Sequence, residues 1–236
     1  MPAAPSKVIT SNRILKSLSS DDLRLIEADL VAVDLPVRKE LEAPRKPIEA
    51  VYFVESGFAS VVANGSKTRS IEVGLIGREG VTGLAIIMGT DRSPNRTFIQ
   101  SAGKGLRLSV ANLTRAMAKS VTLQRKLLNY GHAFFVQTSQ TALANGRGKI
   151  EQRLARWLCM AHDRAEGDEL DLTHEFLSIM LGVRRPGVTM SVEALERAGL
   201  IKTRRGKITV VDRSGLEKAT DGTYGAPEAE FQRMFG

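Results

Sequence analysis

Cys159 and His162 are the residues whose types and spacing first indicate catalytic or metal chemistry. They lie three residues apart on a predicted helix, where a thiol and an imidazole can form half a metal site or a nucleophile with its base. The other histidines, His132 and His174, are distant in sequence, and no further ligand of this type stands nearby. We therefore interpret Cys159 as a small apolar core residue and expect no catalytic residue, metal or cofactor, so not an enzyme.

Basic side chains near the C-terminus carry a different chemistry. Between His174 and Lys207 the sequence holds seven Lys and Arg residues against three Glu, including the pairs Arg184-Arg185 and Arg204-Arg205. A guanidinium can donate two parallel hydrogen bonds to a guanine edge or to a phosphate. This surplus of charge predicts contact with nucleic acid.

The apolar pattern around these arginines predicts the elements that hold them. A first helix begins at Thr173, and Gly182 ends it in a turn. Pro186 fits the first turn of a second helix, which Gly199 ends. Two strands follow, Leu200-Ile201 and 208–211, joined by a basic tip. The helix faces are marked by regularly spaced apolar residues, namely Phe176, Leu177, Met180, Leu181, Val188, Val192 and Leu195. Helix, turn, helix and hairpin predict a winged helix-turn-helix.

Roles in DNA binding follow from these positions. We expect Arg185 to contact bases and Thr189, one turn along, to contact a base or a thymine methyl group. Phosphate contacts are assigned to Arg184, Arg204 and Arg205. His174 either reaches a phosphate or is simply exposed. The expected DNA-binding set is Thr173, His174, Arg184, Arg185, Gly187, Thr189, Arg204 and Arg205.

The segment LTHEFLSIMLGVRRPGV, followed by LERAGLI and RRGKITVVD, closely resembles the DNA-binding domain of the Crp/Fnr family of bacterial transcription regulators. The order of parts agrees along nearly the whole chain. The resemblance implies an α+β protein with an N-terminal cyclic-nucleotide-binding-like antiparallel β-roll over 13–115. It also implies a long dimerisation helix over 116–146 and a C-terminal winged helix-turn-helix over 147–220.

The same resemblance implies a sequence-specific transcription regulator that binds double-stranded DNA as a homodimer at an inverted-repeat operator, with RNA polymerase as a further partner. Family members contact bases through an Arg and a Glu at the start of the recognition helix and an Arg further along. Those positions are Arg185, Pro186 and Met190 here. Only Arg185 is kept, so the family's known target sequence should not be transferred to this chain.

The first half of the chain carries the pattern of the roll. After an arm over 1–12 and a helix that starts at Ser19 or Ser20, short β-rich runs alternate with turn residues. Asn64-Gly65 is a good hairpin turn between two of them. The runs are VAVDLPV, AVYFVE, ASVVA, SIEVGLI, TFIQSA and LRLSV. Many short strands at even spacing predict an antiparallel barrel or roll.

The effector site of the resembled roll is altered in this sequence. Its phosphate-binding cassette pairs a Gly-Glu step, whose Glu binds the ribose hydroxyl, with an Arg-Ser/Thr-Ala step, whose Arg binds the cyclic phosphate. Here the steps read Gly83-Leu84-Ala85 and Arg96-Thr97-Phe98. Leu84 cannot accept a hydroxyl proton, so we expect the fold without binding of cyclic nucleotides. Arg96 is the candidate effector-binding residue, with an exposed loop arginine as the alternative, and the effector stays unknown.

The predicted long helix carries two apolar stripes. Leu123, Leu127, Tyr130 and Phe134 recur in a coiled-coil-like pattern, and Leu128, Phe135 and Ala142 form a second stripe beside them. One stripe can pack on the roll and the other on a twin helix. We assign the first stripe to the dimer interface, and the alternative is a helix buried within one subunit. Asn145-Gly146 and Gly148 predict a hinge before the DNA-binding part.

Composition supports this interpretation. The net charge of +8 and pI of about 9.8 favour an acidic polymer as partner, with nucleic acid first and an anionic membrane second. The sequence lacks a signal peptide and any apolar run long enough for a membrane span, and its single cysteine suits a reducing cytosol, so we expect a cytoplasmic protein without a membrane partner. The alternative function is a metabolite-binding regulatory module whose helix-turn-helix serves protein contact.

Overall fold

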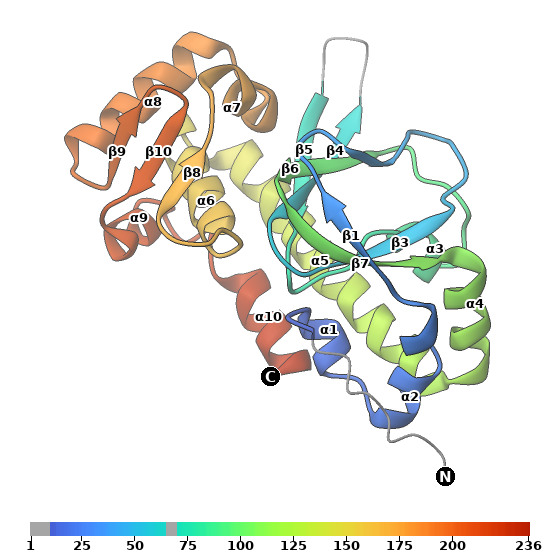
Figure 1. Ribbon diagram of the computed structural model, residues 1–236. Coiled ribbons are helices and arrows are strands. Elements are labelled where there is room, and N and C mark those ends of the chain that lie inside the picture. Colours follow the sequence, from blue (N-terminus) through green and yellow to red (C-terminus); the bar gives the residue numbers. More distant parts are fainter. Residues whose placement is uncertain (1–9, 65–69) are drawn as a thin grey trace.

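The computed structural model of the protein describes residues 10–64 and 70–236. In chain order it has a β-roll with short helices, a long helix, a small α/β unit and a final helix (Figure 1). The roll and the α/β unit lie side by side, and the long helix joins them. No helix in the described part is long and apolar enough to cross a membrane.

The roll consists of two antiparallel sheets, with strand orders β1-β7-β3 and β2-β6-β4-β5. The sheets enclose a small apolar core that includes Val54, Val61 and Ile99. All the predicted strands occur, and β2 is an additional one. The strands are β1 (Val31–Leu35), β2 (Glu40–Glu42), β3 (Ala50–Val54), β4 (Phe58–Asn64), β5 (Ser70–Ile76), β6 (Arg96–Ser101) and β7 (Gly103–Ser109).

Short helices close the ends of the roll. They are α1 (Arg13–Lys16), α2 (Ser20–Arg24), the 3₁₀ helix η1 (Glu27–Asp29), α3 (Leu84–Ile87) and α4 (Val110–Lys119). Ser19 caps α2 as predicted, because its hydroxyl accepts the Asp22 N–H at 3.1 Å. Most of the predicted arm and the residues of the predicted hairpin turn after Asn64 lie outside the described residues. Asn12, at the end of that arm, is buried and donates to the carbonyls of Val54 and Gly80.

The long helix α5 (Val121–Arg147) corrects the predicted dimer interface. Leu123 and Leu127 are fully buried and Tyr130 is 3% exposed, all against the roll within one subunit, and Phe134 is half-buried there. Three of the four residues are therefore not available to a partner helix, and assigning the interface to this stripe was wrong. The periodicity identified both stripes, but it carried no information on which one the roll would cover.

The helix boundaries also differ slightly from the prediction. Ser120 ends α4 and caps α5, since its hydroxyl accepts the Leu123 N–H at 3.1 Å, so the long helix starts at Val121 rather than near 116. It ends at Arg147, and Gly148 follows in extended backbone, whereas Asn145 and Gly146 of the predicted hinge lie inside the helix.

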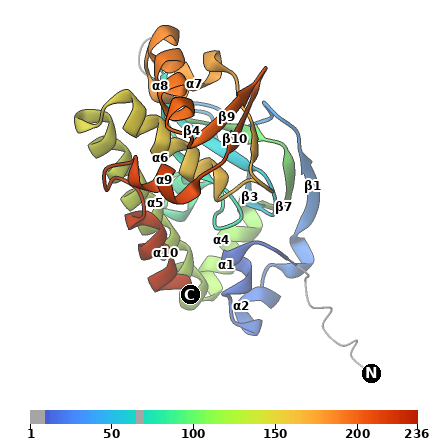
Figure 2. The same ribbon diagram turned by 90° about the vertical axis from the view of Figure 1, so that its left-hand side faces the viewer.

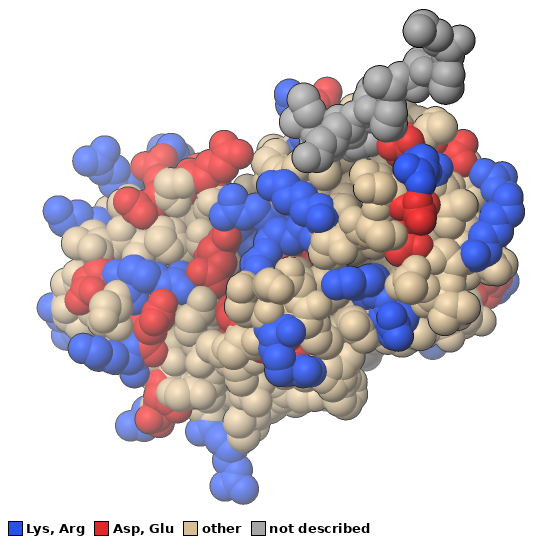
Figure 3. Space-filling model, turned by 90° about the horizontal axis from the view of Figure 1, so that it is seen from below, with Lys and Arg blue, Asp and Glu red and all other residues tan. Residues whose placement is uncertain are grey.

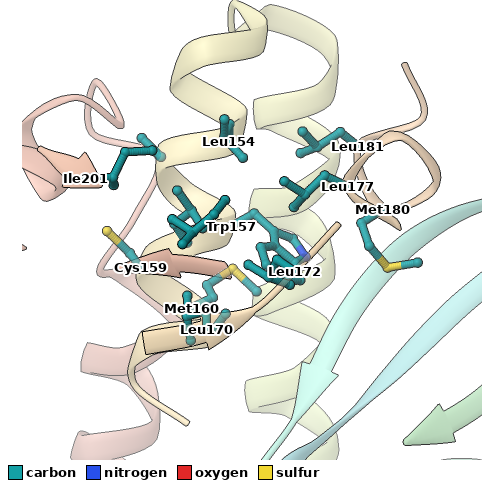
Figure 4. Packing of buried hydrophobic residues seen from close by; sticks show 14 of the residues in the cluster. Leu154, Trp157, Cys159, Met160, Leu170, Leu172, Leu177, Met180, Leu181 and Ile201 are labelled. Atoms are coloured by element: carbon teal, nitrogen blue, oxygen red, sulfur yellow. The ribbon is translucent and has the colours of Figure 1, made fainter. Parts of the chain in front are cut away.

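The α/β unit is a winged helix-turn-helix, as predicted. Its elements are α6 (Ile150–His162), β8 (Glu169–Asp171), α7 (His174–Leu181), α8 (Arg185–Arg197), β9 (Ile201–Arg204), β10 (Lys207–Val210) and α9 (Arg213–Lys218). One face of α6 supplies the centre of its core, where Leu154 and Trp157 meet Leu177 and Leu181 of α7 (Figure 4). The antiparallel wing sheet has the order β8-β10-β9, and β8 was not predicted.

A last helix, α10 (Ala226–Phe235), returns from the winged unit to the middle of the molecule and was missed by the sequence interpretation. It packs along α5, as both views of the ribbon show (Figures 1 and 2). Phe231 is 5% exposed among apolar residues of α5 and lies 4.5 Å below the guanidinium of Arg13 in α1. The spacing of Phe231, Met234 and Phe235 was the available signal for this helix.

Candidate DNA-binding site

The helix-turn-helix is held by local capping and by a buried seam. The Thr173 hydroxyl accepts the Phe176 N–H at 3.2 Å and caps α7. Gly182 takes the left-handed conformation (φ 61°) that the tight turn requires. Val188 and Val192 of α8 are buried against α7 and α6, and Val192 fills the seam position next to Ser191. The hydroxyl of Ser191 is buried there without a partner among the described residues.

The predicted base-contacting and phosphate-contacting arginines lie at the exposed start of α8. Arg184 is the N-cap residue and Arg185 the first residue of the helix, and Pro186 follows in the first turn as predicted. Both arginines are exposed, and neither forms an ion pair within the described part of the chain. Their hydrogen-bond donors are therefore available to an acceptor outside the protein.

Other predicted site residues serve the protein itself. The His174 Nδ1 lies 3.1 Å from the hydroxyl of Thr189, which also donates to the Arg185 carbonyl at 3.2 Å. This contact joins the start of α7 to α8 and leaves both side chains half-exposed. Gly187 faces α6, since a Cβ there would lie 3.1 Å from the terminal methyl of Ile150. Gly187 thus lets α8 approach α6 closely, and its assignment to DNA contact stays a prediction.

The wing tip presents two further free guanidiniums. Arg204 ends β9, Arg205 follows in the turn, and both are exposed without an ion pair in the described residues. Lys207 differs, because Glu169 and Asp171 of β8 neutralise its ammonium group. The two arginines at the tip of the wing thus carry positive charge that no acid of the described residues matches.

Cys159 and His162 do not form a reactive pair. The Cys159 side chain is fully buried, and that burial raises the pKa of its thiol to about 12. His162 instead lies 2.9 Å from a carboxylate oxygen of Asp168. No cluster of three or more His, Cys, Asp or Glu residues suited to a metal occurs within 10–64 and 70–236.

A buried carboxyl group of the roll lies where the phosphate-binding cassette would be. Glu42 of β2 is 8% exposed, and its carboxylate accepts the N–H of Gly83 at 2.6 Å and the Thr97 hydroxyl. Burial raises the pKa of Glu42, although these two hydrogen bonds oppose the shift. A carboxyl group of the chain thus occupies two cassette donors, which the sequence interpretation did not foresee.

Arg96 does not point into the roll. Its guanidinium pairs with Glu40 at 2.7 Å and stacks on Phe98, 5.1 Å from the ring centre. Arg96 and Phe98 alternate along β6 with the buried Thr97 and Ile99, so they face the outer side of the sheet, towards α7. This overturns Arg96 as an effector-binding residue of the roll interior, and the exposed-arginine alternative applies.

A second buried acid links the roll to the winged unit. Glu72 of β5 is 4% exposed, and its carboxyl group accepts the Ser60 hydroxyl at 2.5 Å and the indole N–H of Trp157 at 2.6 Å. Burial raises the pKa of Glu72 to about 7, against the opposing effects of these hydrogen bonds and of Arg164 and Arg156. The sequence signal for this buried group was an acidic residue inside the apolar run SIEVGLI, and the sequence interpretation did not use it.

Comparison with known proteins agrees with this architecture. Residues 152–219 match the family model of the Crp-like helix-turn-helix domain. A structure from Eubacterium rectale assigned to the Crp/Fnr family of transcriptional regulators aligns with 89% of this chain and 98% of its own (TM-score 0.71, 18% identity). FixK2 from Bradyrhizobium japonicum aligns with 80% of this chain and 96% of its own (TM-score 0.69, 19% identity). No curated protein matches the sequence.

Residues 152–219 therefore form a Crp-like helix-turn-helix domain, attached through a long helix to an antiparallel roll. The chain as a whole shares the fold of these two solved structures.

Proposed function

We propose that the protein binds an inverted-repeat operator as a homodimer, with α8 of each subunit in the major groove and each wing tip on the phosphate backbone. The observation that supports this most directly is the set of four exposed guanidiniums, Arg184, Arg185, Arg204 and Arg205, without ion pairs in the described residues. Arg185 is placed to contact a guanine edge, and the other three to contact phosphates.

The second stripe of α5 is the proposed dimer seam. Val121, Leu128, Phe135 and Ala142 recur at every seventh residue, and the first three are 76%, 43% and 64% exposed. Met88, which follows α3 and is 58% exposed, lies beside the stripe, close to Gly131. A seven-residue apolar repeat is the pattern of a helix that pairs with another helix, and a free apolar strip of this length favours association. If α5 pairs with its copy in a second subunit, a two-fold axis relates the two recognition helices.

The proposed regulation does not use a cyclic nucleotide. The carboxylate of Glu42 already takes the Gly83 N–H and the Thr97 hydroxyl, and it would repel a phosphate brought to them. RNA polymerase remains an expected partner, to which we assign no surface.

Selection from random double-stranded DNA with the purified full chain tests the function. We expect an enriched inverted repeat whose half-site centres lie about one DNA turn, roughly 34 Å, apart. The doubly substituted R184A/R185A chain is the matched control and should enrich no sequence. If the unsubstituted chain enriches none at physiological salt, the alternative of a helix-turn-helix that contacts protein is favoured.

A further inference from the structure

A cavity of about 250 Å³ lies where all parts of the molecule meet. The roll contributes Arg78, α5 contributes Tyr130 and Phe134, and α10 contributes Phe231, while Arg13 of α1 completes the wall. The cavity lies outside the roll interior and away from the arginines of α8 and the wing. Figure 3 shows Lys and Arg side chains gathered near the middle of the underside, where α1 and α10 lie.

The carboxyl groups that line the cavity have partners within the protein. Glu79 pairs with the buried guanidinium of Arg164 at 2.7 Å. Asp163 pairs with Arg213 at 2.8 Å and accepts the hydroxyl of Tyr224. The third, Glu228, accepts the N–H of Gly225 at 3.2 Å at the start of α10.

Two guanidinium groups in the cavity wall, by contrast, have no carboxylate partner among the described residues. Arg13 and Arg78 form no ion pair within the described residues, and the remaining residues, 1–9 and 65–69, contain no Asp or Glu. The Arg13 N–H donates to the Arg78 carbonyl at 2.7 Å, which holds the two backbones together. Arg13 uses part of its donor capacity on Gln232, and Arg78 on the Asp163 carbonyl at 3.3 Å. Each guanidinium has five N–H donors, so donors remain on both.

Tyr130 forms part of the cavity wall. Its side chain is 3% exposed, and its hydroxyl is buried against Gly80, with no surface open to a ligand. Phe134 and Phe231 supply apolar surface beside it.

We propose that this cavity binds a small organic anion, a carboxylate carried on a compact apolar body. The carboxylate accepts hydrogen bonds from Arg78 and Arg13, and the apolar body lies on the two phenylalanines. Such a ligand would touch the roll, the long helix and α10 at once. Only its effect on DNA rests on the proposed function, because binding itself is measured without DNA.

Titration calorimetry on the full chain tests the site with benzoate as the probe and the uncharged benzamide as its isosteric comparator. We expect saturable binding of benzoate to one site per chain, and affinity for benzamide lower by roughly tenfold or more, the loss of a charge-assisted hydrogen bond. Arg78→Ala should weaken benzoate binding by a similar factor. Tyr130→Phe, which keeps the ring and removes only the buried hydroxyl, should bind benzoate as the unsubstituted chain does.

The exposed Arg24, which pairs with Asp21 away from the cavity, supplies the control for a change in net charge. Arg24→Ala should bind benzoate as the unsubstituted chain does. Absence of saturable binding at millimolar benzoate would overturn the proposal. Equal affinities in the R78A and R24A chains, or equal affinities for benzoate and benzamide, would overturn it as well.

Discussion

At the scale of single residues, the decisive difference among the basic side chains is whether the chain itself neutralises them. Lys207 is paired with two acids of β8, whereas Arg205, two residues earlier, has no ion pair in the described region. Arg185 has none either and begins α8, where its side chain is exposed. Local charge counts could not separate these cases, because β8 lies more than thirty residues before its partner strand.

Substitution of Arg185 should change which sequence is bound. Arg185→Ala should reduce affinity for the selected operator by roughly 1–3 kcal/mol and relax the preference at one base pair of each half-site. Arg205→Ala should instead weaken binding to all DNA sequences similarly. It should also lower the slope of log affinity against log salt concentration by about one per subunit. Fluorescence anisotropy at several salt concentrations measures both. An unchanged base preference in the R185A chain would contradict the assignment.

The pKa of Glu72 predicts a pH dependence of stability. In the unfolded chain this carboxyl titrates near the ordinary value of 4.5, and in the folded chain near 7. The folded state therefore holds the proton more tightly, so its contribution is complete below pH 4.5 and is lost as pH rises to about 7. The loss amounts to roughly 3 kcal/mol, at 1.36 kcal/mol per pKa unit.

Glu72→Gln isolates this contribution, since an amide keeps an oxygen for the Trp157 N–H and an NH₂ group that can donate to the Ser60 hydroxyl, but does not ionise. Urea unfolding at several values between pH 5 and 8 should show the decline in the unsubstituted chain and a flatter profile in the E72Q chain. Parallel profiles would show that Glu72 is not the group responsible.

At the scale of elements, periodicity predicted most of what the structure contains. Alternation in the first half placed the strands of the roll, and the turn glycine with its flanking apolar series placed α7 and α8. Periodicity could not show which other part of the molecule packs against each face of a helix. Leu127 and Leu128 are adjacent and equally apolar, yet Leu127 is fully buried under the roll and Leu128 is 43% exposed. That difference depends on α3 and β3, which pack on one side of α5 only.

The corrected seam predicts the effect of a charge on α5. Phe135→Asp should raise the dissociation constant of the dimer by roughly tenfold or more, because the carboxylate would be buried between apolar side chains. Folding should be intact, since Phe135 is 64% exposed in the subunit. Light scattering over a concentration series measures the shift, and operator affinity should fall with it. Val31→Asp, at a 55% exposed site on the roll, is the control and should stay dimeric. A dimer of unchanged strength in the F135D chain would reject this seam.

At the scale of the whole molecule, the order of roll, long helix and winged unit followed from the sequence, whereas the contacts between these parts did not. Glu72 lies in a predicted strand and Glu42 in β2, which was not predicted, and the two carboxyl groups bond to groups distant in sequence, Trp157 and Gly83. The final helix α10 was missed because its three apolar residues make sense only beside α5 and α1.

The structure of the roll predicts which ligand it does not bind. Cyclic AMP should not bind, because Leu84 offers no acceptor for the ribose and Glu42 already occupies donors of the cassette. Calorimetry with cyclic AMP should show no saturable heat, and operator affinity should be the same with and without it. Micromolar binding together with tighter operator binding would refute this.

The course of α10 has a mechanical consequence. The winged unit is joined to the rest of the chain at both of its ends, through Gly148 at its start and through the segment that leads into α10 at its end. The unit also packs on the roll, through α7 against β5 and through the Glu72–Trp157 hydrogen bond, so turning about the line between its two ends requires these contacts to break. If α10 stays on α5, the two recognition helices of a dimer can change their relative pitch along one path only. The winged unit would then move by rotation about a single axis.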